Sequence, residues 1–159
     1  NEEYGFEVKY PENYIASDPN KDLTAENKDR LAENKKSLVV DFTNLSDRER
    51  FNFQIRVKRK EYGGLVEYVN EMEKEIGCVR LDCSSPQIFN EQKVVLSGEV
   101  DGLRREEFAA TKFYTTRFIK SGHAFELSYW GRYSGPDDAG FSEEERKTYD
   151  LFERSFRFR

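Results

Sequence analysis

The chain has 159 residues and a formal net charge of −5 at pH 7, from 26 Lys and Arg against 31 Asp and Glu. This length suits one domain over residues 1–159, and the acidic balance is a poor match for a phosphate backbone, so a nucleic-acid-binding protein is not expected. The 13 Phe, 9 Tyr and 1 Trp argue against disorder despite a mean hydropathy of −0.89, and no apolar run is long enough to predict a membrane-spanning helix.

The first half of the chain is typical of antiparallel strands interrupted by a polar loop. Apolar and polar residues alternate over residues 6–10, 38–43 and 51–58, which is the two-residue period of a half-buried strand. Pro11 ends the first of these strands because it has no N–H for a ladder. The polar residues 12–36 are expected to form either a long surface loop or a loop with a short amphipathic turn around residues 23–31.

A helix is predicted over residues 65–76, where apolar residues recur on one stripe. Gly77 stands where a left-handed C-terminal cap is expected. Residues 78–92 are expected to be an irregular connection. Beyond them, Ser97-Gly98 and Asp101-Gly102 are typical of turns.

The second half predicts a meander of strands. Residues 106–120 contain many rings among Thr and Arg, and residues 123–130 form a return strand after a tight turn at Ser121-Gly122. On the return strand we expect Glu126 and Ser128 to face outward. The residues expected to face inward are Phe125, Leu127 and Tyr129.

A last helix is predicted after the loop at residues 134–140. Ser142 and Glu145 have the spacing of a capping box, in which each side chain satisfies an otherwise unpaired N–H group. The inward stripe of this helix is expected to comprise Tyr149, Phe152 and Phe156. Runs of strands with helices set between them predict an α+β fold, an antiparallel sheet covered by helices.

Both ends of the chain resemble a known family. Residues 5–14, GFEVKYPENY, are similar to the G-F-x-h-x-Y-P-x-x-[WY] start of PsbP-like domains, where h is apolar. The meander 113–129 and the closing helix into Ser155-Phe156-Arg157-Phe158 resemble the family's end. The group includes extrinsic oxygen-evolving proteins of photosystem II, bacterial exported lipoproteins and a Ran-binding nuclear import factor. The resemblance implies an α/β/α sandwich with a central antiparallel sheet and, in most members, no catalysis.

The two cysteines of the chain give an indication of the cellular compartment in which the protein is located. Cys78 and Cys83 are close enough in sequence to close a small disulfide loop in an oxidising compartment, and two free thiols are the alternative. With His123 they fall short of the four ligands of a zinc site. The chain begins at Asn1 without Met, which we interpret as a mature or trimmed form. These features favour an extracytoplasmic protein of the periplasmic, cell-surface or thylakoid-lumen type, above all the exported lipoprotein branch with a membrane tether before Asn1.

The motifs for catalysis and metal binding are weak. His123 lies beside a turn, where a solvated side chain is expected, and no nucleophile pattern accompanies it, so neither an enzyme nor a cofactor is predicted. Asp18, Asn20 and Asp22 have the spacing that opens a calcium loop, but Leu23 stands where that loop needs glycine. A solvated polar loop is therefore the favoured interpretation.

An aromatic group near the end of a strand is the better candidate for a binding surface. Tyr129, Trp130 and Tyr133 are rings of the kind found at interfaces, and Trp130 falls on the face opposite Tyr129. The alternative is that Trp130 packs under a helix on the second face of the sheet.

These observations favour a non-catalytic exported or membrane-tethered accessory domain that binds another protein. A small hydrolase or ligand-binding protein is the alternative function, with a carboxylate-lined cleft drawn from Glu106, Glu107 and Glu126. A cytosolic adaptor similar to the nuclear import factor is a third hypothesis, which free thiols would support.

Overall fold

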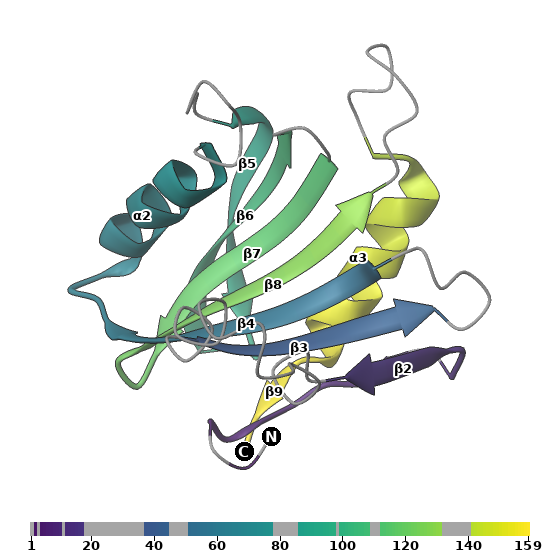
Figure 1. Ribbon diagram of the computed structural model, residues 1–159, viewed down its shortest axis with the longest axis horizontal. Coiled ribbons are helices and arrows are strands. Elements are labelled where there is room, and N and C mark those ends of the chain that lie inside the picture. The colour runs from purple at the N-terminus through teal and green to yellow at the C-terminus, as the bar shows by residue number, and fades with distance from the viewer. Residues whose placement is uncertain are drawn as a thin grey trace, which may run out of the picture.

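A computed structural model describes residues 2, 4–10, 12–17, 37–44, 51–77, 86–97, 99–108, 112–131 and 141–159 (Figure 1). In chain order its elements are β1 (Phe6–Glu7), β2 (Tyr14–Ser17), β3 (Ser37–Asn44), β4 (Phe51–Glu61), α2 (Leu65–Gly77), β5 (Gln87–Leu96), β6 (Val100–Phe108), β7 (Lys112–Lys120), β8 (His123–Gly131), α3 (Glu143–Ser155) and β9 (Arg157–Phe158).

The strands form one large antiparallel sheet and one small one. The seven-stranded sheet has the order β2-β3-β4-β8-β7-β6-β5, and β1 pairs with β9 in a two-stranded sheet that brings both ends of the chain together. Every described strand pair is antiparallel. The α+β class with a mainly antiparallel sheet is confirmed.

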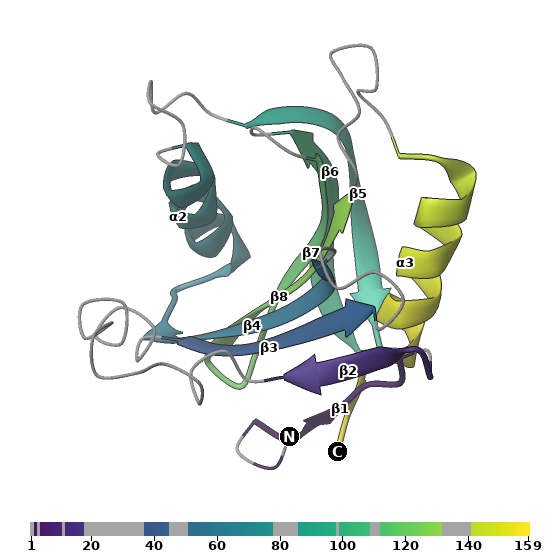
Figure 2. The same cartoon turned by 45° about the vertical axis from the view of Figure 1, so that its right-hand side comes forward.

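The two helices lie over opposite faces of the twisted sheet (Figure 2). Successive side chains of a strand point to opposite faces, so alternate side chains of β8 lie on the α3 side and on the α2 side of the sheet. Its Phe125 and Leu127 join the core beside α3, whereas Ala124 packs with Tyr68 and Met72 of α2. The sheet therefore has an α3 face and an α2 face.

The α3 face carries the main hydrophobic core, which is mostly aromatic. Phe53 of β4 is fully buried and stacks on Phe152 of α3, with ring centroids 4.4 Å apart. Phe118 and Phe125 stack across β7 and β8 at 5.1 Å. Each such ring removes roughly 150–250 Å² from water, so this face supplies most of the hydrophobic stabilisation.

The α2 face is polar, which corrects the expectation for β8. Glu126 and Ser128 were expected to face outward but are only 5% and 3% exposed. Because alternation along one strand shows which residues share a face but not whether a second layer covers it, the pattern identified the faces correctly and their burial wrongly.

Two predictions around β5 are also wrong. Residues 87–92 belong to β5, although they were expected to be irregular, and Asp101-Gly102 lies inside β6. Gly102 is closely packed there, because a Cβ at this position would lie 2.7 Å from Leu96 Cδ1 and 3.2 Å from the Arg117 carbonyl oxygen, so a larger residue would displace its neighbours. The chain instead reverses after Leu96, where Ser97 has a φ of 48°.

Other boundaries differ at the strand ends. The expected strand 6–10 is regular only at Phe6–Glu7, and β2 lies within the expected loop 12–36. The expected strand 106–120 is two strands, β6 and β7. The first helix and the capping box of Ser142 and Glu145 are confirmed, with both reciprocal hydrogen bonds present.

Candidate functional site

The α2 face of the sheet holds a line of polar and charged side chains that crosses six strands. Antiparallel register places Glu91 opposite Arg105, Arg117 opposite Glu126, and Glu126 opposite Arg56. We name this line the charge row. From β5 to β3 its members are Glu91, Arg105, Glu107, Arg117, Glu126, Arg56, Gln54 and Asp41.

Arg117 stands at the centre of the charge row with a carboxylate on each side. Its Nε donates to Glu126 Oε2 at 2.7 Å. Its Nη1 and Nη2 donate to the two oxygens of Glu107 at 2.7 and 2.9 Å, a bidentate pair. All three side chains are buried, so each charge depends on its neighbours for the solvation that water would otherwise provide.

The ends of the charge row are bound as well. Arg105 forms ion pairs with Glu91 on β5 and with Glu73 on α2, which ties the helix to the sheet. At the other end, Gln54 Nε2 donates to an Asp41 carboxylate oxygen at 2.7 Å and its carbonyl accepts from Arg56.

The electrostatics hold the centre of the charge row ionised. Burial disfavours the charged form of Glu126, but the positive charges of Arg117 and Arg56 outweigh it and lower the pKa of Glu126 below its ordinary value. Burial likewise opposes the charge on Arg117, while Glu126 and Glu107 raise its pKa above the ordinary value. The Tyr68 ring lies over this region from α2, and burial raises the pKa of its hydroxyl, which keeps it neutral.

This arrangement is unsuited to acid–base catalysis by the carboxylates that the sequence singled out. Glu107 and Glu126 do meet, but at Arg117, and Glu106 lies on the other face with its carboxylate bound by Arg146. A general acid needs a raised pKa, whereas the pKa of Glu126 is lowered. The charge row therefore acts as a structural network of paired ions.

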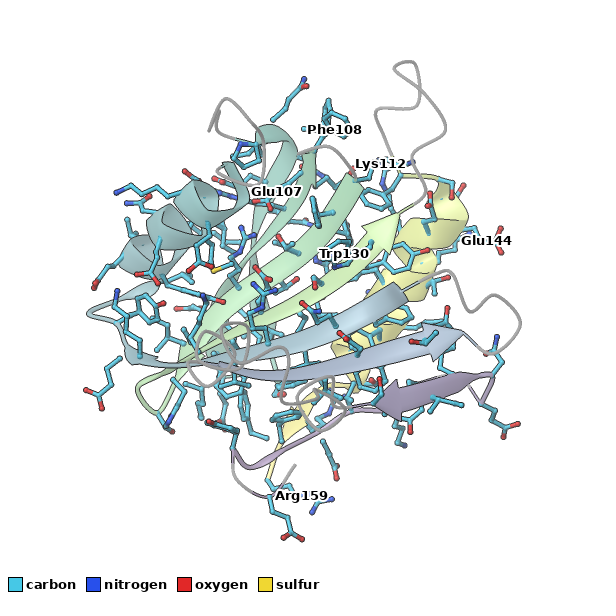
Figure 3. The ribbon with its side chains drawn as sticks, viewed as in Figure 1. Glu107, Phe108, Lys112, Trp130, Glu144 and Arg159 are labelled. Atoms are coloured by element: carbon cyan, nitrogen blue, oxygen red, sulfur yellow. The ribbon has the colours of Figure 1, made fainter. Side chains whose placement is uncertain are left out.

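An aromatic pair lies at one end of the same face. Trp130 of β8 stands opposite Phe113 of β7, and their rings meet edge to face with centroids 4.8 Å apart. Trp130 is 38% exposed and Phe113 is half-buried. In Figure 3, Trp130 lies on the same end of the sheet as Glu107, Phe108 and Lys112.

The predicted aromatic group divides between the two faces. Tyr129 is buried on the α3 face, with its ring 5.1 Å from that of Phe53. Trp130 lies on the α2 face, and Tyr133 is outside the described residues. Sequence reasoning missed Phe113, although its opposition to Trp130 follows once the turn at residues 121–122 fixes the register of β7 and β8.

The remaining predicted residues carry no described site. His123 lies at a sheet end, where Tyr4 contacts its ring edge to face and Nδ1 is 3.1 Å from the Ser121 carbonyl oxygen. The predicted calcium-loop residues and the two cysteines lie outside the described ranges: Asp18, Asn20, Asp22, Leu23, Cys78 and Cys83.

The described ranges contain no cluster of three or more His, Cys, Asp or Glu arranged for a metal ion. None of the helices in the same ranges has the length and apolar character to span a bilayer.

Comparison of folds finds a similar solved structure. The solution structure of cyanobacterial PsbP (CyanoP) from Synechocystis sp. PCC 6803 superposes with a TM-score of 0.60 at 13% sequence identity, over 100% of this chain and 89% of that chain. A crystal structure from Bacteroides thetaiotaomicron VPI-5482 has a TM-score of 0.42 at 13% identity, and the match spans 98% of this chain and 45% of that one. No family model and no curated protein matches the sequence. The first similarity shows that the chain has a PsbP-like fold, as its two ends predicted.

Proposed function

We propose that the chain is a non-catalytic accessory domain that works by binding another protein. Its PsbP-like fold supports this proposal. The charge row supports it as well, because its central ions pair with one another. In this proposal residues 1–159 form one domain, an α/β/α sandwich in which α2 and α3 enclose the sheet.

The binding surface that we propose is centred on Trp130 and Phe113. The single observation that carries it is a partly exposed tryptophan held edge to face by a neighbouring ring. Tryptophan is enriched among residues that dominate interface energies, because it offers a large and rigid contact area. Tyr133, three positions after Trp130, extends this surface in the proposal, while Tyr129 supports it from the core.

The proposed location is extracytoplasmic, with an anchor or export signal encoded before Asn1. A disulfide between Cys78 and Cys83 is part of this proposal, because such bonds persist in oxidising compartments. Thiol titration of the denatured chain without reductant tests it. No reactive thiol is expected, and two reactive thiols would contradict the location and favour the cytosolic adaptor.

Site-specific photo-cross-linking in the source organism tests the binding surface. A photoreactive phenylalanine derivative at Trp130 is expected to give one discrete adduct, which mass spectrometry identifies. The matched control places the same group at Leu151, which is 72% exposed on α3 and far from Trp130 in sequence and face. Equal adducts from both positions, or none from Trp130, would contradict the surface. The identified protein is then purified and titrated against the wild-type chain and Trp130→Ala, which is expected to bind at least tenfold more weakly.

A further inference from the structure

The β5 strand forms an edge of the seven-stranded sheet. In the part of the chain that the structure describes, β5 pairs with β6 on one side and has no strand on the other. It has ten residues, most of them exposed, and its exposed apolar side chains include Phe89 at 40% and Val95 at 62%. A long edge strand offers a row of unpaired N–H and C=O groups to another strand.

The sequence of β5 is complementary to itself about Gln92. If two copies pair antiparallel with Gln92 opposite Gln92, then Glu91 of each copy stands opposite Lys93 of the other. On the other face, Asn90 of each copy stands opposite Val94 of the other, and the regular pairing ends there because the β5–β6 register shifts between Ile88 and Asn90. Residues directly opposite in an antiparallel pair have Cβ atoms about 4.5–5.5 Å apart, close enough for ion pairs and apolar contact.

The charges of β5 are available for this pairing. Both contacts from Arg105 to Glu91 reach the same oxygen, Oε2, and 47% of the Glu91 side chain is exposed. Lys93 is exposed and has no ion-pair partner among the described residues. Lysine on an edge strand commonly prevents indiscriminate pairing, because a facing strand must supply an acid to accept it. In the register centred on Gln92, a second copy supplies that acid.

A groove beside β5 fits the same occupant. It has a volume of about 540 Å³ and lies between α2 and the strands β5 and β6, lined in part by Val66, Val69, Val95 and Leu103. Val66 is 74% exposed at the start of α2. Glu91 and Lys93 line the same groove, so a second copy that pairs with these two residues borders its mouth.

From these observations we infer that the β5 edge is a homodimer interface, in which two copies pair antiparallel about Gln92 and join their sheets into one. Two ion pairs between Glu91 and Lys93 fix the register. The interface is independent of the proposed protein-binding surface, because Phe113 and Trp130 lie on β7 and β8. Either proposal can therefore fail while the other stands.

Charge reversal with complementation tests the register. Sedimentation equilibrium of the wild-type chain is expected to show a concentration-dependent monomer–dimer equilibrium. Lys93→Glu places like charges opposite each other twice, and Glu91→Lys does the same with the opposite sign. Each variant alone is expected to show a dissociation constant raised roughly tenfold or more. An equimolar mixture of the two variants restores both attractions and is expected to dimerise as a heterodimer.

Controls separate the interface from effects on folding. Lys147→Glu on α3 changes the net charge equally and is expected to leave the equilibrium unchanged, since Lys147 lies away from β5 and pairs with Glu143 of its own helix. In Glu91→Lys, Arg105 keeps Glu73 and Glu107, and circular dichroism checks that the fold persists. A wild-type monomer at every concentration, a dimer that Lys93→Glu leaves unchanged, or a mixture that stays monomeric would each overturn the inference.

A cross-link at the symmetry axis provides an independent test. Gln92→Cys places two thiols directly opposite each other, so mild oxidation is expected to give a covalent dimer beyond any formed by the parent chain. Asn90→Cys on the same strand is the matched control, because its two copies are offset by four residues, about 13 Å along the strand. Equal cross-linking of both variants, or none at Gln92→Cys, would overturn the register.

Discussion

Arg117 and Glu126 face each other across β7 and β8, with side chains that are only 1% and 6% exposed and a hydrogen bond of 2.7 Å between Nε and Oε2. Glu107 binds the same guanidinium from the other side, so two carboxylates share one cation inside the protein. Buried ions of this kind add less net stability than their attraction suggests, because all of them lose their hydration. What the arrangement does impose is mutual dependence, since loss of Arg117 leaves two buried carboxylates without their shared cation, and loss of either carboxylate leaves the buried guanidinium with one partner fewer.

Replacing Arg117 is therefore expected to destabilise the protein strongly. Arg117→Met leaves Glu107 and Glu126 buried without their shared cation, and the free energy of unfolding is expected to fall by about 3–5 kcal/mol. Urea denaturation followed by circular dichroism measures it. Lys147→Met is the control, because its ion pair with Glu143 is exposed and its loss is expected to cost at most about 0.5 kcal/mol. Equal losses in the two variants would show that the central ions are not coupled as the structure indicates.

The lowered pKa of Glu126 makes the free energy of unfolding depend on pH in the acidic range. Because the folded-state pKa lies below that of the unfolded chain, Glu126 contributes stability that is fully present above the ordinary glutamate pKa of about 4.3. This contribution is lost as the pH falls from there through the folded-state pKa. Glu126→Gln removes the titrating group, so its free energy of unfolding is expected to fall less steeply below that pH than that of the wild type. Parallel curves from urea titrations at each pH would contradict the assignment.

The α3 helix depends on its first turn. The Ser142 hydroxyl accepts from the Glu145 N–H at 3.2 Å, and the Glu145 carboxylate accepts from the Ser142 N–H at 2.7 Å. Ser142→Ala removes one of these bonds and is expected to lower the free energy of unfolding by about 1 kcal/mol. Ser142→Asp keeps an acceptor and is expected to recover most of the loss in the same thermal or urea measurement. A loss from Ser142→Asp as large as that from alanine would argue against the cap.

The sequence predicted the elements whose two faces differ clearly. Apolar residues alternate along β4 and β8 and recur every three or four residues along α2, because each of these elements has one apolar and one polar side. The capping box was predicted from the spacing of Ser142 and Glu145 alone. β5 was missed because it lies at a sheet edge with most of its side chains in water, so no alternation of burial is imposed on residues 87–92. Asp101-Gly102 suggested a turn, whereas Gly102 lies within β6 and packs closely against Leu96 and the Arg117 carbonyl of the neighbouring strand, which no local pattern indicates.

The candidate site was only partly predictable for a similar reason. Trp130 and its face followed from alternation along β8, but the charge row depends on which strands are neighbours. Arg117 meets Glu107 and Glu126 only because β7 lies between β6 and β8. Side-chain spacing along one strand carries no information on that order, so a buried Arg between two buried Glu residues looks like ordinary surface charge in the sequence.

Trp130 is the single tryptophan of the chain, so its fluorescence reports directly on the proposed binding surface. At 38% exposure, with Phe113 against it, its emission is expected to lie between those of buried and fully solvated indole and to be partly quenched by acrylamide. Phe113→Ala removes the ring that shields it, so emission is expected to shift to the red and quenching to increase. The lost aromatic contact itself accounts for about 0.5–1.5 kcal/mol of unfolding free energy. Leu151→Ala on α3 removes an exposed apolar side chain elsewhere and is expected to leave the spectrum unchanged. If Phe113→Ala also left it unchanged, the two rings would not be in contact in solution, and the proposed surface would lose the feature that holds its tryptophan in place.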